Sequence, residues 1–172
     1  IAKKMKDRDL ETVIVTGDKD MMQLVNEKIS ILDSMKERRI RVPEVRERFG
    51  VDPERVPDVL ALAGDSSDNI PGVPGIGEKT AIKLLQEYGT LENLLKHSEK
   101  IPGKLGEKLR QSEKEAILFK ELATIVTDAP IHFDFKNFQL KEPDGTALKE
   151  LFTELEFHRL LSELAPEKTL ST

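Results

Sequence analysis

The first third of the chain has short apolar runs between charged segments, which predicts alternating strands and helices. Residues 12–16 form a continuous β-branched run that Gly17 stops, and such a run is typical of a strand buried on both faces of a parallel sheet. Further elements are expected as a short helix over 21–25, a strand over 29–32, a polar edge over 36–41 and a short helix over 44–49. This pattern predicts an α/β unit over residues 1–56.

From residue 57 the apolar positions follow a helical period. Pro57 suits the first turn of a helix that ends at Gly64, and an amphipathic helix over 81–88 ends at Gly89. Further helices are expected over 91–95 and 112–125, separated by a loop that contains Pro102, Gly103 and Gly106. The pattern predicts an all-α subdomain over residues 57–127, and no internal repeat is evident.

The remaining residues predict a closing segment and a linker. Residues 128–140 look extended, with Phe133, Phe135 and Phe138 available for core contacts. Leucine spacing then predicts two short helices, so the segment 128–164 is expected to pack on the core. Residues 165–172 contain Pro, Ser and Thr without periodicity, which indicates a linker.

Composition narrows the class of protein. The chain has 172 residues, and its apolar runs are far shorter than the roughly 20 residues that a membrane helix needs. It has no cysteine, which excludes disulfides and thiolate-bound zinc and fits a reducing cytoplasm. The net charge is -5, but ten of the 32 acidic and only five of the 27 basic residues follow residue 120, so the first 120 residues are neutral. Any binding of a phosphate backbone must therefore depend on local geometry rather than on overall charge.

The most specific motif is GVPGIGEKTAIKLL over residues 72–85. Glycines at 75 and 77 permit positive φ and close approach of a ligand, while Ile76 between them can turn inward. Amides at the start of the next helix can then face an anion that the helix dipole favours, and such contacts read no base edge. The residues expected to contact a DNA backbone are Gly72, Val73, Gly75, Ile76, Gly77, Lys79, Thr80 and Lys83. A plain connector rich in Gly and Pro is the alternative.

Two pairs of aspartates follow the ends of predicted elements. Asp18 and Asp20 follow the first strand, and Asp65 and Asp68 follow the helix that begins at Pro57. Mg²⁺ and Mn²⁺ prefer carboxylate oxygens, and two such ions can stabilise the attacking water and the leaving oxygen in phosphodiester hydrolysis. Capping of helices and turns explains either pair alone equally well. A phosphatase-like reading with Asp18 as nucleophile is also possible, but it leaves the hairpin unexplained.

Three stretches together resemble a known family: VIVTGDKDMMQLV, LALAGDSSDNIPGVPGIGEKTAIKLL and ELATIVTDAP. They are similar to the 5′-to-3′ exonuclease domain of bacterial DNA polymerase I, which belongs with the flap endonucleases. The resemblance implies a structure-selective nuclease that binds duplex DNA beside a 5′ flap or nick and cuts by a two-metal mechanism. It implies that Asp18, Asp20, Asp65 and Asp68 are catalytic ligands of Mg²⁺ or Mn²⁺. Carbonyls near Val73 and Ile76 could also hold K⁺.

The same resemblance sets expectations for fold and context. It implies the C-terminal part of a parallel-sheet core, PIN-like or Rossmann-like, followed by an all-α helix-hairpin-helix subdomain. Because relatives have further site residues before the strand over 12–16, the chain is expected to be a fragment that is inactive or weak by itself. A bacterial cytoplasmic, nucleoid-associated protein of replication and repair, with a polymerase domain fused to it, is the implied context.

The main alternative is a non-catalytic, sequence-independent DNA-binding module whose acidic residues are caps. Four lysines at positions 96, 100, 104 and 108 either touch the DNA backbone or form a solvated face. The three histidines, at positions 97, 132 and 158, lie beside no nucleophile and are expected to have no catalytic role.

Overall fold

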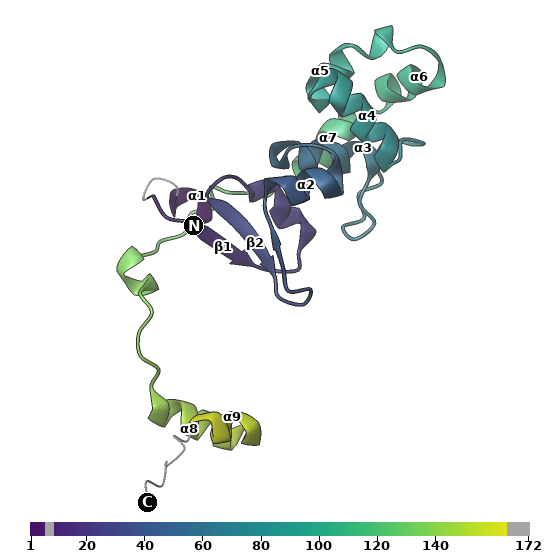
Figure 1. Cartoon of the computed structure of the whole chain (residues 1–172). Coiled ribbons are helices and arrows are strands. Elements are labelled where there is room, and N and C mark those ends of the chain that lie inside the picture. The colour runs from purple at the N-terminus through teal and green to yellow at the C-terminus, as the bar shows by residue number, and fades with distance from the viewer. Residues whose placement is uncertain (6–8, 165–172) are drawn as a thin grey trace, which may run out of the picture. The chain divides into compact units, whose positions relative to one another are not determined.

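The computed structural model describes residues 1–5 and 9–164, in two compact units that divide between Ala129 and Pro130 (Figure 1). The predicted linker over 165–172 lies outside the described residues. The first unit contains, in order, α1 (Ala2–Met5), β1 (Thr12–Val15), the 3-10 helix η2 (Lys19–Leu24), β2 (Ile29–Asp33), β3 (Arg38–Ile40), α2 (Val42–Phe49), the 3-10 helix η3 (Pro53–Arg55), α3 (Val56–Ala63), α4 (Glu78–Tyr88), α5 (Leu91–Lys96), the 3-10 helix η4 (Ser98–Lys100), α6 (Gly103–Gln111) and α7 (Glu113–Ala123).

The sheet has the strand order β1-β2-β3, with β1 parallel and β3 antiparallel to β2. Most side chains of the central strand β2 are buried, whereas Val13 and Val15 of the edge strand β1 are 43% and 63% exposed. The prediction that β1 is buried on both faces is therefore wrong for this chain. A β-branched run reports strand propensity, but burial of both faces depends on what covers the sheet.

One hydrophobic cluster extends from the sheet into the helices of the first unit. It includes Ile31 of β2, Phe49 of α2, Leu62 of α3 and Leu84 of α4. Helix α3 is buried along almost its whole length, because α4 and α7 both pack against it (Figure 1). This confirms the helix expected between Pro57 and Gly64 and explains why its residues other than Asp58 are apolar on every side.

Helix α6 forms where a loop was expected, so that prediction was wrong. Residues 101–108, IPGKLGEK, repeat VPGIGEK of residues 73–79 with one residue inserted, a repeat that was not recognised in the sequence. Gly103 has φ +71° and Gly75 has φ +79°, so the two turns share a left-handed glycine. Gly106 lies inside α6, where a Cβ would collide with the Ile101 carbonyl. Close packing at position 106 therefore requires a glycine, and this glycine does not end the helix.

An ion cluster around the buried Asp58 joins three helices. The Nζ of Lys120 on α7 lies 2.5 Å from Oδ1 of Asp58 on α3 and 2.6 Å from Oε1 of Glu92 on α5. The Asp58 side chain is fully buried. Burial raises the pKa of Asp58, and the Lys120 ammonium opposes this rise. Lys120 is therefore the principal counterion of a buried carboxyl group.

The second unit contains the 3-10 helix η5 (Phe135–Phe138), α8 (Gly145–Glu154) and α9 (His158–Leu164). These two helices confirm the two short helices that the leucine spacing predicted. Phe133 and Phe135 contact the ring of Phe138 at centroid distances of 5.6 and 6.2 Å, but none of the three rings is buried. The packing of the segment 128–164 on the core stays a prediction. In the part of the chain that the structure describes, no helix is both long and apolar enough to cross a membrane.

Candidate active site

Two turns present the predicted aspartates. Asp18 and Asp20 follow β1 at its C-terminal end, and Asp65 begins the turn that follows α3. This second turn is closed by an antiparallel bridge between Asp65 and Ile70, whose backbone N···O distances are 2.7 and 2.9 Å. The two acidic segments therefore sit on structured element ends rather than on long loops, which suits ligands that must hold a fixed geometry.

Three of the four predicted carboxylates converge. Single ligand oxygens of Asp20, Asp65 and Asp68 all lie within 4.8 Å of one another, a spacing that could hold a metal ion. Asp18 lies outside this group: its Oδ1 accepts the backbone N–H of Asp20 at 2.9 Å and caps η2. The structure thus combines the two interpretations of the pair, with Asp20 in the cluster and Asp18 as a cap beside it.

The cluster contains carboxylate oxygens without a hydrogen-bond donor. Within the described residues, Oδ1 of Asp20 and Oδ2 of Asp65 are buried and have no hydrogen-bond partner. Burial, followed by the charges of Asp18, Asp68 and Asp65, raises the pKa of Asp20 to about 6. Buried, unpartnered oxygens of like charge are costly, and a hard divalent cation would satisfy them. The donor set therefore fits Mg²⁺ or Mn²⁺.

This repulsion predicts how the metal-free chain responds to pH. A carboxyl group whose pKa is raised on folding adds stability at low pH, and that stability is lost as the pH rises through the folded pKa, here about 6. In EDTA, Asp20→Asn is therefore expected to raise the melting temperature at pH 7.5 and to raise it much less at pH 4, near the ordinary pKa of an aspartate. Thermal unfolding followed by circular dichroism measures both. An equal effect at the two pH values would contradict the assignment of the shift to Asp20.

Lys19 is a member of this site that the sequence analysis did not identify. Its Nζ lies 2.6 Å from Oδ1 of Asp65 and 3.3 Å from Oγ of Ser67. Burial by itself would raise the pKa of Asp65, but the Lys19 and Ser67 hydrogen bonds outweigh it and the pKa lies below its usual value. The only local signal was the position of Lys19 between two aspartates, which does not reveal a partner 46 residues away.

The predicted hairpin lies between α3 and α4, with its apolar residues inside. Val73 and Ile76 are buried, whereas Gly75, Gly77, Lys79 and Lys83 are exposed and Thr80 is half-buried. Helix α4 begins after Gly77 without a side-chain cap. The first amides of an uncapped helix have no acceptor within the helix, so they are available to a ligand. The inward turn of Ile76 is confirmed.

Two glycines link the hairpin to the acidic turn. Gly72 has φ +69°, and a Cβ on it would collide with the backbone of Gly64. Gly64 has φ +83° and would in turn meet the carbonyls of Ile70 and Pro71. Gly72 is therefore buried as a packing residue, and the aspartate turn and the hairpin are held against each other by direct backbone contact.

A second hairpin residue comes from α6. The Nζ of Lys108 lies against the glycine turn, where a Cβ on Gly75 would collide with it. Of the four lysines that were expected either to touch DNA or to form a solvated face, Lys108 reaches the glycine turn, and Lys100 shares a pocket with Thr80 and Lys83. The repeat of the hairpin sequence, once recognised, would have indicated Lys108, in the last turn of α6, as the counterpart of Lys79.

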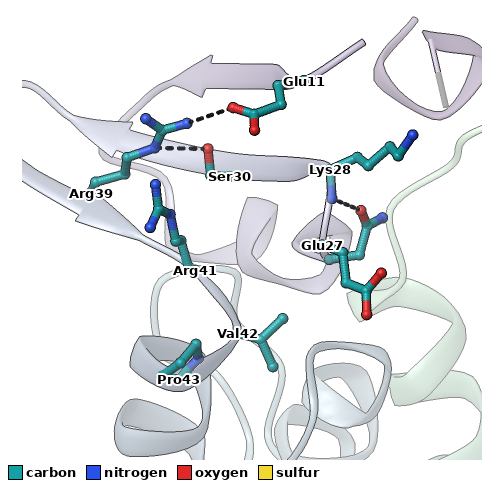
Figure 2. A pocket seen from close by; sticks show the side chains of 9 residues that line it. Glu11, Glu27, Lys28, Ser30, Arg39, Arg41, Val42 and Pro43 are labelled. Atoms are coloured by element: carbon teal, nitrogen blue, oxygen red, sulfur yellow. Dashed lines mark hydrogen bonds and ion pairs between the residues drawn. The ribbon is translucent and has the colours of Figure 1, made fainter. Parts of the chain in front are cut away.

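One cavity lies away from the carboxylates. It has a volume of about 390 Å³ and lies near the N-terminal ends of β1 and β2 (Figure 2). Arg39 crosses its wall, donating to Oγ of Ser30 at 3.1 Å and pairing with Glu11 at 3.7 Å. Arg39 and Glu11 pair with each other and Lys28 pairs with Asp9, and none of Asp20, Asp65 and Asp68 lines this cavity.

An acidic cluster at a sheet edge, packed against a helical hairpin, defines an α/β protein of the nuclease class. Residues 1–50 match the family model "5'-3' exonuclease, N-terminal resolvase-like domain", and residues 51–146 match "5'-3' exonuclease, C-terminal SAM fold". The chain therefore belongs to the 5′-3′ exonuclease family, whose members are metal-dependent nucleases. This confirms the fold class and the family expected from the sequence.

Individual relatives agree with the family match. The chain is 45% identical over 165 residues to the thermostable DNA polymerase I of Thermus filiformis, covering 95% of this chain and 20% of that protein. It is 36% identical over 164 residues to a 5′-3′ exonuclease of Aquifex aeolicus, covering 95% of this chain and 56% of that one. A flap endonuclease of bacteriophage T5, solved as a pseudo-enzyme-product complex with DNA and metal ions, superposes with a TM-score of 0.65 at 25% identity, covering 71% of this chain and 46% of that one. The chain thus spans about half of the Aquifex aeolicus exonuclease and about a fifth of the Thermus filiformis polymerase.

Proposed function

We propose that this chain is the part of a 5′-to-3′ exonuclease and 5′-flap endonuclease that holds the DNA backbone and supplies part of a two-metal site. The observation that supports this most directly is the convergence of Asp20, Asp65 and Asp68, where two buried oxygens have no hydrogen-bond partner among the residues that the structure describes. Full activity belongs to the longer protein, since further metal ligands are expected before β1. The test is cleavage of a 5′-flap duplex, with and without Mg²⁺, after the preceding segment is supplied in cis or in trans.

The chain's own residues would hold and orient the metal ions. Asp18, Asp20, Asp65 and Asp68 are the proposed ligands. The last three converge in the structure, and Oδ1 of Asp18 also caps η2 and fixes the backbone that presents Asp20. Bound divalent ions would activate water and stabilise the leaving oxygen of a phosphodiester. Mg²⁺ and Mn²⁺ both suit an all-oxygen donor set of short carboxylates.

The hairpin would hold the DNA backbone beside that centre. The exposed turn at Gly75 and Gly77, the amides at the start of α4, and the side chains of Lys79, Thr80 and Lys83 would contact successive phosphates. Carbonyls of Val73 and Ile76 are the proposed K⁺ ligands. Because none of these groups reads a base edge, recognition would follow the shape of a duplex with a 5′ flap or nick rather than its sequence.

Lys108 extends this surface from the second hairpin. Lys108→Ala is expected to weaken binding to a nicked duplex about three- to tenfold and to reduce the slope of log affinity against log salt by about one. Fluorescence anisotropy in EDTA at several salt concentrations measures both quantities. Lys28→Ala is the matched control. Lys28 directly precedes β2, outside the hairpin segments, and its replacement should change neither quantity. Equal losses for the two variants would show that Lys108 contributes only overall charge.

The wider context follows from the relatives. We propose that the chain is fused to a polymerase domain in a cytoplasmic, nucleoid-associated protein. We also propose that it divides into a core over 1–56, a helix-hairpin-helix subdomain over 57–127 and a closing segment over 128–164. A phosphatase-like role for Asp18 has no support from the family match. The DNA-binding module without catalysis is also not favoured, because capping alone does not explain three converging carboxylates.

A further inference from the structure

Lys19 places an ammonium group inside the proposed metal site. Its side chain is 34% exposed and its Nζ lies 2.6 Å from Oδ1 of Asp65, a carboxylate that is only 2% exposed. The same Nζ is 3.3 Å from Oγ of Ser67 in the turn after α3. An ion pair with one buried partner is screened by solvent much less than a surface pair. The cluster therefore already contains one positive charge before any metal binds.

The two oxygens of Asp65 have different surroundings. Oδ1 accepts hydrogen bonds from Lys19 and from the backbone N–H of Ser67, the latter at 3.0 Å. Oδ2 is buried and, within the described residues, has no partner. The ammonium thus occupies one side of the carboxylate and leaves the other side for a cation. A divalent ion bound at Oδ2 would lie close to the Lys19 charge, and the two would repel each other.

We propose that Lys19 is an internal counterion that lowers the affinity of the carboxylate cluster for divalent metal. This inference rests on the proposed function, since it requires Asp20, Asp65 and Asp68 to be metal ligands. Lys19 holds Asp65 in place in the metal-free protein and weakens ion binding until further ligands or a substrate phosphate add negative charge. The charge of Lys19, rather than the shape of its side chain, has this effect.

Calorimetric titration of the chain with Mn²⁺, without DNA, tests the proposal. Lys19→Met is expected to bind Mn²⁺ about tenfold more tightly than the wild type, while Lys19→Arg, which retains the charge, should stay close to the wild type. Lys28→Met is the matched control, because Lys28 also pairs with an aspartate, Asp9, and lines a cavity away from the carboxylate cluster. It should change the affinity by less than about twofold. Thermal unfolding of each variant verifies that the fold is retained.

The outcomes separate this inference from the proposed function. Equal Mn²⁺ affinity for wild type and Lys19→Met, with weaker binding by Asp68→Asn, would overturn the counterion role and leave the metal centre intact. Weaker binding by Lys19→Met would also overturn it, since Lys19 would then only position Asp65. If Asp68→Asn binds Mn²⁺ as well as the wild type does, the carboxylate cluster is not the metal site and both proposals fail.

Discussion

Replacing Asp68 with Asn is expected to reduce Mg²⁺-dependent cleavage of a 5′-flap duplex at least about a hundredfold, because a metal ion contributes several kcal/mol to stabilising the transition state. Asp68 is exposed, so the change removes a ligand charge without disturbing the core. The assay uses the chain extended by the segment that precedes the matched region in its relatives. Rates are measured under single-turnover conditions over a range of Mg²⁺ concentrations.

Two further measurements make this result specific. Asp52→Asn, which removes an exposed carboxylate paired with Arg46, should cleave at the wild-type rate. DNA affinity in EDTA should be unchanged by Asp68→Asn, because the hairpin and not the carboxylate holds the backbone. If the extended wild-type chain binds the flap duplex but does not cut it, the non-catalytic binding module would be favoured instead.

Replacing Lys120 with Met is expected to destabilise the chain by about 3 kcal/mol, because Asp58 loses its principal counterion and keeps only Arg55 at 3.8 Å. Lys120 lies 2.5 Å from Asp58, which is fully buried. The free energy of unfolding in urea measures the loss. Lys114→Met, on the exposed face at the start of the same helix, is the control and should have an effect within about 0.5 kcal/mol.

The pH dependence of this variant has a definite sign. Burial raises the pKa of Asp58, and removing Lys120 removes the group that opposes this rise. A raised carboxyl pKa adds stability at low pH that is lost as the pH increases. The deficit of Lys120→Met should therefore be largest at neutral pH and should shrink toward the ordinary pKa of an aspartate. The double variant Asp58→Asn with Lys120→Met should recover most of the stability. A deficit that is independent of pH and persists in the double variant would point to lost packing instead.

Local sequence patterns were sufficient to predict most of the helices and strands. The β-branched run over 12–16 and the Pro57 to Gly64 segment encode a strand and a helix through backbone preferences that act over a few residues. Helix α6 was missed because Gly103 and Gly106 were interpreted by their average tendency to break helices. In the structure Gly106 is required by contact with the Ile101 carbonyl, which no single-residue tendency can express.

The sequence by itself determined the order of elements, the family and the chemical types of the site residues, because glycine turns, apolar period and motif spacing are local properties. Only the tertiary structure decided which of these residues meet. It separated Asp18, a cap, from the Asp20, Asp65 and Asp68 cluster, and it brought Lys19 to an aspartate 46 residues away. Such contacts depend on how the sheet and helices pack, and packing is a property of the whole core rather than of any short segment.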